Sequence, residues 1–259
     1  MYNFDYVKAS SVADATAALG GDAQAISGGQ TLIPTLKARL GQPSSLVDLS
    51  GVAEMSGITA GDGSVTIGGA VTHHAVSESG DVPASVAALA AGIGDPAVRH
   101  RGTIGGSVAN NDPSACYPSA CLGLGATIHT SGGDVAADDY FQGMFDTALG
   151  EGQIVTGVTF PTPAKANYQK FVQPASRFAL VGVFVSQMAD GYVRVAVTGA
   201  SESGVFRWSD AETALAGNFS ADAVPAAPSA DGMIADLHGS AAYRAHLISV
   251  MTKRAVAAC

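Results

Sequence analysis

The chain has 259 residues, of which 47% are hydrophobic and 14% charged, and its formal net charge at pH 7 is −9. This length allows one large domain or two modest ones, and the composition is sufficient for a hydrophobic core. The negative charge argues against a nucleic acid or an anionic membrane as partner, no apolar run reaches the roughly 18 residues of a membrane span, and the first residues lack a signal-peptide pattern.

The first 67 residues predict short strands and helices in alternation. Ser11 is a helix-capping residue, Gly20-Gly21 ends the helix that follows it, and Asp62-Gly63 predicts a hairpin turn. The expected elements are a strand over 4–7, a helix over 12–19, a strand over 23–26, a helix over 31–40, a strand over 45–49 and a hairpin over 58–67.

The middle of the chain predicts helices around a long glycine loop. Thr72 caps a helix that begins with His73 and His74. Because adjacent residues point to different faces of a helix, we expect these histidines to be solvated or capping rather than a metal-binding pair. The other expected elements are a helix over 84–91, a glycine loop over 92–113, a helix over 117–124, paired strands over 126–129 and 135–137, a helical turn capped by Asp138-Asp139 and running through 145, and a strand over 154–160.

The sequence Pro161-Thr162-Pro163 predicts a hinge, after which the pattern changes. Segments 168–172, 181–188 and 192–198 alternate as strands do, which predicts a three-stranded antiparallel sheet. A helix over 210–215, a loop over 221–228 and an amphipathic helix over 243–258 follow, the last with Leu247, Ile248 and Met251 on its inner face. The predicted domains are therefore 1–163, with subdomains of about 1–55 and 56–163, and 164–259.

Two glycine-rich stretches carry most of the chemistry that the sequence suggests. Ser27-Gly28-Gly29-Gln30-Thr31 lies between a predicted strand and a predicted helix, and Thr103-Ile104-Gly105-Gly106-Ser107 lies near the middle of the chain. Paired glycines let the backbone approach a ligand closely, and N–H groups at a helix start bind anions. Neither stretch has the Walker or the Rossmann spacing. The residues alone leave two interpretations open: two loops that hold a pyrophosphate, or two turns that close strands.

The three cysteines, Cys116, Cys121 and Cys259, form no recognisable pattern. An odd, unpatterned set is typical of a reducing compartment and predicts a cytoplasmic protein. A [2Fe–2S] cluster usually takes four cysteine ligands, and no histidine cluster completes a zinc site. Any iron–sulfur chemistry therefore belongs to another chain, and the sequence predicts no metal ligands here.

Three long motifs, in order, give the chain a family resemblance: 28–40, 99–113 and 168–179. Together they resemble the FAD-binding medium subunit of molybdenum hydroxylases, the family of aerobic carbon monoxide dehydrogenase and of the xanthine dehydrogenase flavin domain. The resemblance covers nearly the whole chain. It implies an α+β fold, with a two-subdomain FAD-binding domain of the vanillyl-alcohol oxidase type and a small C-terminal domain of three antiparallel strands and helices.

The same resemblance implies an oxidoreductase subunit that carries FAD and transfers electrons. Its partners would be a large subunit with the molybdenum cofactor and a small subunit with two [2Fe–2S] clusters, assembled as a dimer of heterotrimers, a heterohexamer. The final acceptor is left open among quinone, oxygen and NAD, and so is a peripheral contact with a quinone-bearing membrane. The alternatives are a stand-alone FAD-dependent oxidase of the vanillyl-alcohol oxidase class and an assembly subunit that has lost its flavin.

The resemblance also implies which residues contact FAD. Residues 27–32 and 103–107 would supply pyrophosphate and neighbouring contacts, Asn110 would lie further along the cofactor, and Ile93 would pack near the adenine. Cys116 stands where many members carry an aspartate that binds the ribityl chain or ribose, so we expect Asp112 or backbone groups to compensate. For Cys116 itself we expect the role of a buried small residue, and covalent attachment of flavin is the alternative. The full predicted set is Ile26, Ser27, Gly28, Gly29, Gln30, Thr31, Leu32, Ile93, Thr103, Gly105, Gly106, Ser107, Asn110, Asp112, Cys116 and Leu180.

Overall fold

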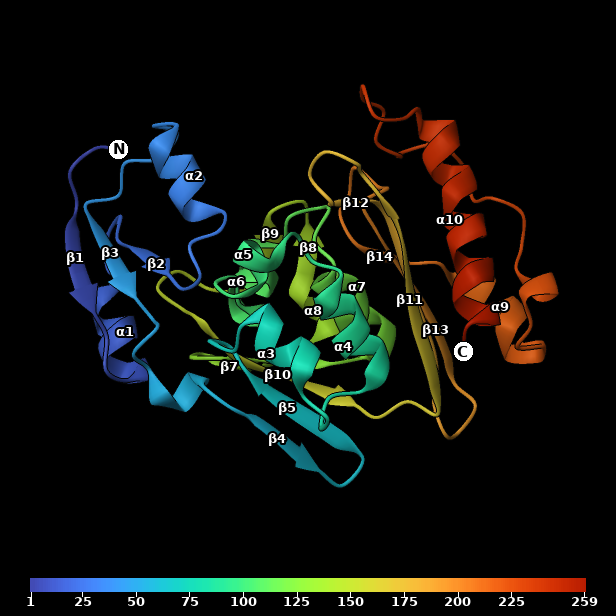
Figure 1. The fold of residues 1–259 in the computed structure, drawn as a ribbon, viewed down its shortest axis with the longest axis horizontal. Helices are drawn as coiled ribbons and strands as arrows, with labels where there is room; N and C mark the ends of the chain where they lie inside the picture. Colours follow the sequence, from blue (N-terminus) through green and yellow to red (C-terminus); the bar gives the residue numbers. More distant parts are fainter.

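A computed structural model describes residues 1–259 as three bodies, each built on its own main sheet (Figure 1). The N-terminal sheet has three parallel strands, the middle sheet five antiparallel strands and the C-terminal sheet four antiparallel strands. The prediction of a three-stranded C-terminal sheet is therefore wrong. The fourth strand, β14 (Phe206–Arg207), pairs with the end of β13 (Val193–Thr198), and two residues are too few to show the alternation of a strand.

The N-terminal body has the strand order β1-β3-β2 and two short helices. Ser11 caps the first helix as predicted, because its Oγ accepts the Asp14 N–H at 3.0 Å. The second helix ends earlier than predicted because Arg39 takes a left-handed conformation with φ 59°. The elements are β1 (Asp5–Lys8), α1 (Val12–Ala18), β2 (Gln24–Ile26), α2 (Leu32–Lys37), β3 (Ser45–Asp48) and the 3₁₀ turn η1 (Ala53–Met55).

The middle body has the strand order β4-β5-β10-β6-β7, so the chain returns at β10 to fill the centre of the sheet. Six helices accompany this sheet, and its largest fully buried side chains include Tyr117, Tyr140 and Phe160. The elements are β4 (Ile58–Gly61), β5 (Ser64–Gly68), α3 (His73–Glu78), α4 (Ala84–Ala91), α5 (Pro96–Arg99), α6 (Ile104–Asn110), α7 (Tyr117–Leu124), β6 (Thr127–Thr130), β7 (Gly133–Ala136), α8 (Ala137–Tyr140), β8 (Phe141–Gly143), β9 (Asp146–Thr147) and β10 (Val155–Pro161).

Two helices, α5 and α6, occupy half of the predicted glycine loop over 92–113, which corrects the sequence interpretation. Asp95 caps α5, where its Oδ1 accepts the Val98 N–H at 2.9 Å, and Thr103 caps α6, where its Oγ1 accepts the Gly106 N–H at 3.1 Å. The helical turn predicted through Phe145 also ends early, at Tyr140. The β8–β9 hairpin replaces it, because the Asn111 side-chain amide donates to the carbonyls of residues 143 and 146.

The C-terminal sheet lies between two layers of helix, the last helix of the chain on one face and helices of the middle body on the other. Val181, Val183 and Val185 on β12 pack with Leu247, Ile248 and Met251 of α10, while Phe184 packs with the helical core of the middle body. The predicted inner face of the last helix is therefore buried. The elements are β11 (Lys165–Val172), β12 (Ala179–Gln187), β13, β14, α9 (Ser209–Gly217), the 3₁₀ turn η2 (Ala221–Ala223) and α10 (Ala241–Ala257).

Candidate functional site

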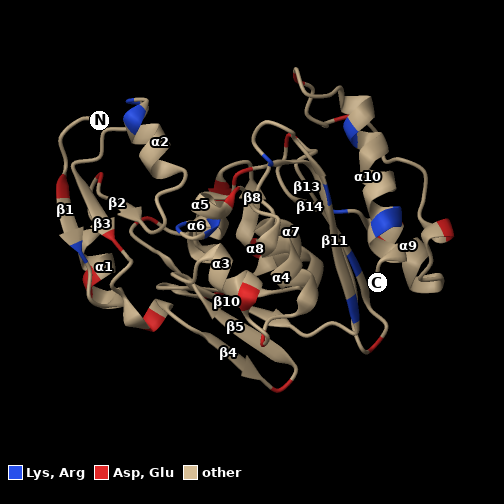
Figure 2. Cartoon of the chain, in the orientation of Figure 1, with Lys and Arg blue, Asp and Glu red and all other residues tan.

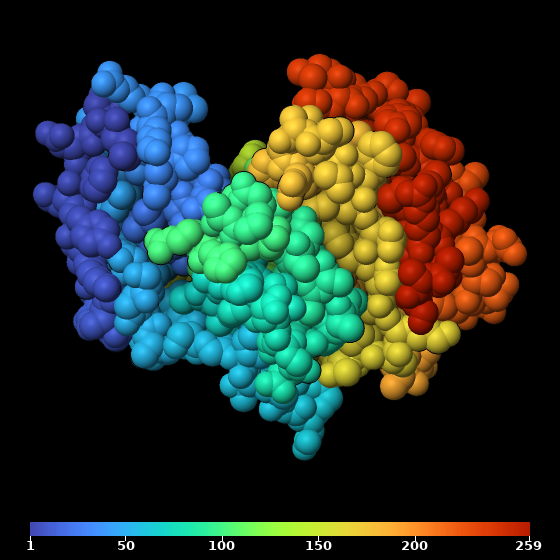
Figure 3. Space-filling view, viewed as in Figure 1, coloured from blue at the N-terminus to red at the C-terminus, as the bar shows by residue number.

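A cavity of about 720 Å³ is lined by residues of all three bodies. Its walls come from the β2–α2 loop, from the segment between α4 and α7, and from β11 with the loop that follows it. Figure 3 shows a hollow between the N-terminal body, drawn in blue, and the rest of the molecule. A volume in the range of about 300–1,000 Å³ is typical of small-molecule and cofactor sites.

The β2–α2 loop presents an uninterrupted row of unpaired backbone donors. None of the N–H groups from Ser27 to Leu32 donates a hydrogen bond within the protein. The loop is held in place at Gly28, where a Cβ would come within 2.1 Å of the Arg101 carbonyl oxygen, and at Gly29, which has φ +70°. Since unpaired N–H groups in a tight loop attract anions, this wall is suited to phosphate oxygens.

The start of α6 contributes differently from what the sequence suggested. The N–H groups of Ile104, Gly105 and Ser107 donate to the carbonyls of residues 71, 69 and 103, so they are not free for a ligand. Gly105 is buried against Gly69, where a Cβ would lie 2.6 Å from the carbonyl oxygen, whereas Gly106 is exposed and its Cβ would meet only Thr103 Oγ1, at 3.1 Å. This segment therefore offers a smooth glycine surface and hydroxyl groups rather than a second row of amides.

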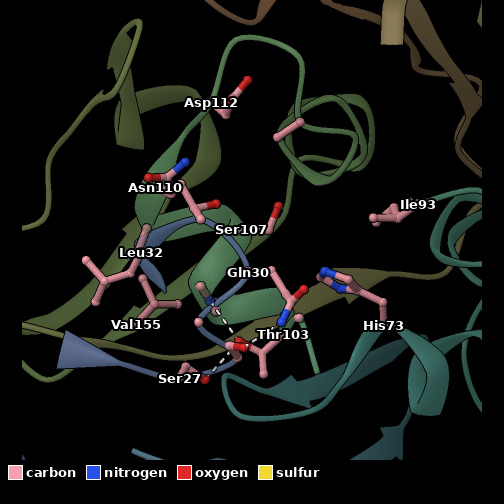
Figure 4. Close-up of a pocket in the computed structure, with 18 of the residues that line it drawn as sticks. Ser27, Gln30, Leu32, His73, Ile93, Thr103, Ser107, Asn110, Asp112 and Val155 are labelled. Atoms are coloured by element: carbon pink, nitrogen blue, oxygen red, sulfur yellow. Dashed lines mark hydrogen bonds between the residues drawn. The ribbon is translucent and has the colours of Figure 1, made fainter. Parts of the chain in front are cut away.

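Hydroxyl and amide side chains join the two walls and continue along the cavity. Ser27 Oγ and Thr103 Oγ1 lie 3.0 Å apart, which links the β2–α2 loop to the cap of α6. Figure 4 shows Ser107, Asn110 and Asp112 following in order along one side, away from Ser27 and Thr103. These polar groups suit a hydroxyl-rich chain that runs on from a phosphate.

Lys170 holds together the wall furthest from the N-terminal body. Its Nζ donates to the carbonyls of Gly92, at 2.7 Å, and Arg177, at 3.1 Å, and lies 3.6 Å from Cys116 Sγ. Cys116, which is 5% exposed, lines the cavity where the resemblance led us to expect an aspartate. The lysine thus ties the end of α4, the cap of α7 and the β11–β12 loop into one surface. Figure 2 shows basic residues along β11 and α10.

His73 also lines the cavity, contrary to the solvated or capping role predicted for it. The side chain is 5% exposed, and burial, assisted by the charge of Arg99, lowers its pKa to about 4. Nδ1 is buried without a hydrogen-bond partner. The neighbouring His74 stacks on His100 at a ring distance of 3.9 Å and does not line the cavity. The two histidines therefore lie on different faces of α3, with His73 at the cavity and His74 outside it.

The structure brings almost all of the predicted site residues to this cavity. Leu180 is the exception: it is buried beside a smaller cavity of about 170 Å³ together with Arg244. Sequence reasoning missed His73, Val155, Lys170, Arg177 and Phe178, none of which belongs to a glycine motif. The predicted residues that line it are Ile26, Ser27, Gly28, Gly29, Gln30, Thr31, Leu32, Ile93, Thr103, Gly105, Gly106, Ser107, Asn110, Asp112 and Cys116.

Two further findings concern the chain as a whole. No three His, Cys, Asp or Glu side chains lie together in a geometry that could hold a metal ion. No helix combines the length and the apolar character needed to cross a membrane.

The sequence matches a known family and several curated proteins. The family model, described as the FAD binding domain in molybdopterin dehydrogenase, matches residues 2–163. The carbon monoxide dehydrogenase medium chain of Afipia carboxidovorans is 33% identical, over 98% of this chain and 96% of that protein. The nicotine 6-hydroxylase medium subunit of Paenarthrobacter nicotinovorans is 32% identical, over 97% of this chain and 95% of that protein.

Solved structures with similar folds include two oxidoreductases. A chain of quinoline 2-oxidoreductase from Pseudomonas putida 86 superposes with a TM-score of 0.88 and 29% identity, over 99% of this chain and 96% of that chain. A chain of the Cu,Mo-CO dehydrogenase gives a TM-score of 0.85 and 31% identity, over 98% of this chain and 96% of that chain. The similarity therefore extends through all three bodies.

Proposed function

The chain belongs to the family of FAD binding domains in molybdopterin dehydrogenase, and from that membership we propose that it is the FAD-carrying, electron-transfer subunit of a molybdenum hydroxylase complex of the carbon monoxide dehydrogenase type. Such a subunit takes electrons from [2Fe–2S] clusters of a partner and delivers them to an external acceptor. Relatives matched over nearly their full length are named medium chains or medium subunits, which supports this role. The chain is thus an oxidoreductase component, and the molybdenum cofactor and clusters belong to its partners.

The row of unpaired N–H groups from Ser27 to Leu32 is the observation that carries the assignment of FAD to this cavity. A pyrophosphate needs several donors at once. Ser27, Gly28, Gly29 and Leu32 are half-buried, and half-buried amides without acceptors are rare unless a ligand or water pairs with them. The exposed Gly106 leaves the facing wall free of side-chain bulk. These features fit a dinucleotide whose phosphates lie between the β2–α2 loop and the start of α6.

When bound, FAD supplies a redox group that accepts and releases electrons; this chain's residues bind, orient and shield it. Ser27, Thr103 and the loop amides would hold the phosphates, and Ser107, Asn110 and Asp112 would hold the polar chain beyond them. Lys170 would keep the opposite wall closed. No acid–base pair is needed from the protein for this task.

We place the domain boundary at the Pro161–Pro163 hinge, supported by the family match that ends at residue 163 and by the start of β11 at Lys165. The first domain would comprise subdomains of about 1–55 and 56–163, of the vanillyl-alcohol oxidase type. The three free cysteines support a reducing, cytoplasmic location.

The complex would contain a large molybdenum subunit and a small iron–sulfur subunit, in two copies of each heterotrimer. Relatives named as medium chains of dehydrogenases support the presence of larger and smaller companions. A quinone-bearing membrane is one candidate acceptor surface, beside oxygen and NAD. A stand-alone oxidase is less well supported, because the relatives matched over nearly their whole length are named as subunits.

The test is the flavin content of the purified chain. We expect about one FAD per chain, released into solution by denaturation. A chain with intact fold that is purified without flavin and does not take it up would contradict the proposal. Flavin that stays with the denatured polypeptide would instead indicate covalent attachment, for which Cys116 is the candidate.

A further inference from the structure

His73 is fixed next to the phosphate end of the cavity by its own backbone. Its N–H donates to the Gly102 carbonyl at 2.9 Å, and the Ile104 N–H donates to the Val71 carbonyl at 3.1 Å. These two bonds form a short antiparallel bridge between Thr72 and Thr103. Thr103 also contacts Ser27 and so joins the β2–α2 loop to the start of α6. The residue to which His73 is bonded, Gly102, directly precedes Thr103 in the chain.

The His73 ring has no hydrogen-bond partner in the protein, although it is nine-tenths buried. Its exposed fraction is 5%, Nδ1 is inaccessible and unpaired, and no protein group pairs with Nε2. The Tyr117 ring lies 5.4 Å away, and a Cβ on Gly102 would come within 2.6 Å of Nε2, so protein packs closely around the ring. Figure 4 shows the ring pointing into the cavity, between Ile93 and Thr103. Nε2 is not among the fully enclosed atoms, so it is the ring nitrogen that a partner in the cavity can reach.

The neighbouring residues identify which part of a dinucleotide that partner would be. On one side of Thr103 the cavity continues with Ser107, Asn110 and Asp112, which suit a polyol chain. On the His73 side it continues with Ile93, Gly94 and Val98, an apolar surface that suits a flat purine ring. His73 therefore lies where a phosphate meets an adenosine.

We propose that His73 is a binding residue for the adenosine diphosphate half of the cofactor, to which Nε2–H donates a hydrogen bond. The inference rests on the proposed binding of FAD. The hydrogen is assigned to Nε2 because the alternative tautomer would bury an N–H donor at Nδ1 with no acceptor. Burial and the nearby charge of Arg99 keep the ring neutral above about pH 4, so it acts as a neutral donor.

The experiment compares the affinities of FAD, ADP and FMN for the flavin-free full chain in three variants. His73→Phe keeps a ring but removes the donor, His73→Gln restores an N–H donor, and His74→Ala changes the neighbour that stacks outside the cavity. We expect His73→Phe to weaken FAD and ADP by about tenfold, as for loss of a hydrogen bond to a charged group, and to leave FMN unchanged. His73→Gln should recover most of the affinity, and His74→Ala should behave as wild type.

Each other outcome overturns the inference in a distinguishable way. Equal FAD affinity in folded His73→Phe and wild type would show that the ring makes no contact. Weakened FMN with unchanged ADP would place His73 at the flavin half. A steep loss of wild-type affinity as the pH rises from 5.5 to 8 would indicate a charged histidine rather than a neutral donor. A wild-type chain that binds none of the three ligands would refute the proposed function itself.

Discussion

Gly105 and Gly106 are adjacent in α6, yet the structure predicts opposite consequences for the same substitution. A Cβ at Gly105 would lie 2.6 Å from the Gly69 carbonyl oxygen and 2.8 Å from its Cα, which are backbone atoms that cannot move aside cheaply. A Cβ at Gly106, which lines the cavity, would meet only the Thr103 hydroxyl, at 3.1 Å. Valine at each position therefore separates folding from cofactor binding.

The magnitudes follow from these contacts. At Gly106 the helix itself gains or loses no more than about 0.5 kcal/mol, because valine is a slightly better helix residue than glycine. A branched side chain against the phosphates costs about 1–3 kcal/mol, as overpacking does, or about 5- to 150-fold in FAD affinity. At Gly105 the valine side chain would clash with the backbone of Gly69 instead of with a ligand. We therefore expect the free energy of unfolding to fall by about 3 kcal/mol and Tm by roughly 6–12 °C.

The assay is thermal unfolding followed by circular dichroism, together with FAD titration of the flavin-free chain. We expect Gly106→Val to unfold at the wild-type temperature and to bind FAD weakly or not at all. We expect Gly105→Val to unfold at a markedly lower temperature. Full flavin occupancy in a folded Gly106→Val protein would refute the reasoning, since it would mean that Gly106 faces no cofactor.

Three further outcomes are expected from groups around the cavity and the C-terminal body. Lys170→Met removes the donor that ties Gly92 to Arg177, so FAD affinity measured by calorimetry should fall about tenfold; an unchanged Kd would contradict this. Arg244→Met leaves the buried carbonyls of residues 180 and 199 without their donor, and should cost about 3 kcal/mol in urea unfolding while leaving FAD affinity as in wild type. Burial lowers the pKa of His73 from 6.5 to about 4, so on acidification the unfolded chain takes up a proton at this residue before the folded chain does. The free energy of unfolding is therefore unaffected by this residue above pH 6.5 and decreases as the pH falls toward 4. Relative to His73→Gln, the wild type should therefore lose about 2–3 kcal/mol more between pH 7 and 4.5, and equal losses would refute the burial argument.

The parts of the site that the sequence predicted are those whose chemistry resides in the backbone. Gly28-Gly29 after an apolar run indicated a loop with free amides, and the structure has such a loop. Capping side chains at Ser11 and Thr72 placed two helix starts correctly, because a cap acts within three residues.

The parts that could not be predicted depend on distant contacts. The amides of α6 are already paired because β5 and the turn after it lie beside them, which no local pattern reveals. His73 became a cavity residue through its pairing with Gly102, some 30 residues away in the chain. The strand β14 pairs with the edge that β13 offers, and Leu180 borders a second, smaller cavity that Arg244 and residues of the β11–β12 loop also line.

We infer that this chain carries the terminal redox group of a larger enzyme, not a complete catalytic site. The most direct measurement is the rate at which the chain alone, and the chain co-purified with its partner subunits, transfer electrons from candidate substrates to an artificial acceptor. We expect turnover only by the complex, while the FAD of the isolated chain is still reduced by a chemical reductant. Substrate turnover by the isolated chain, at a rate comparable with the complex, would contradict the subunit assignment and support a stand-alone oxidase.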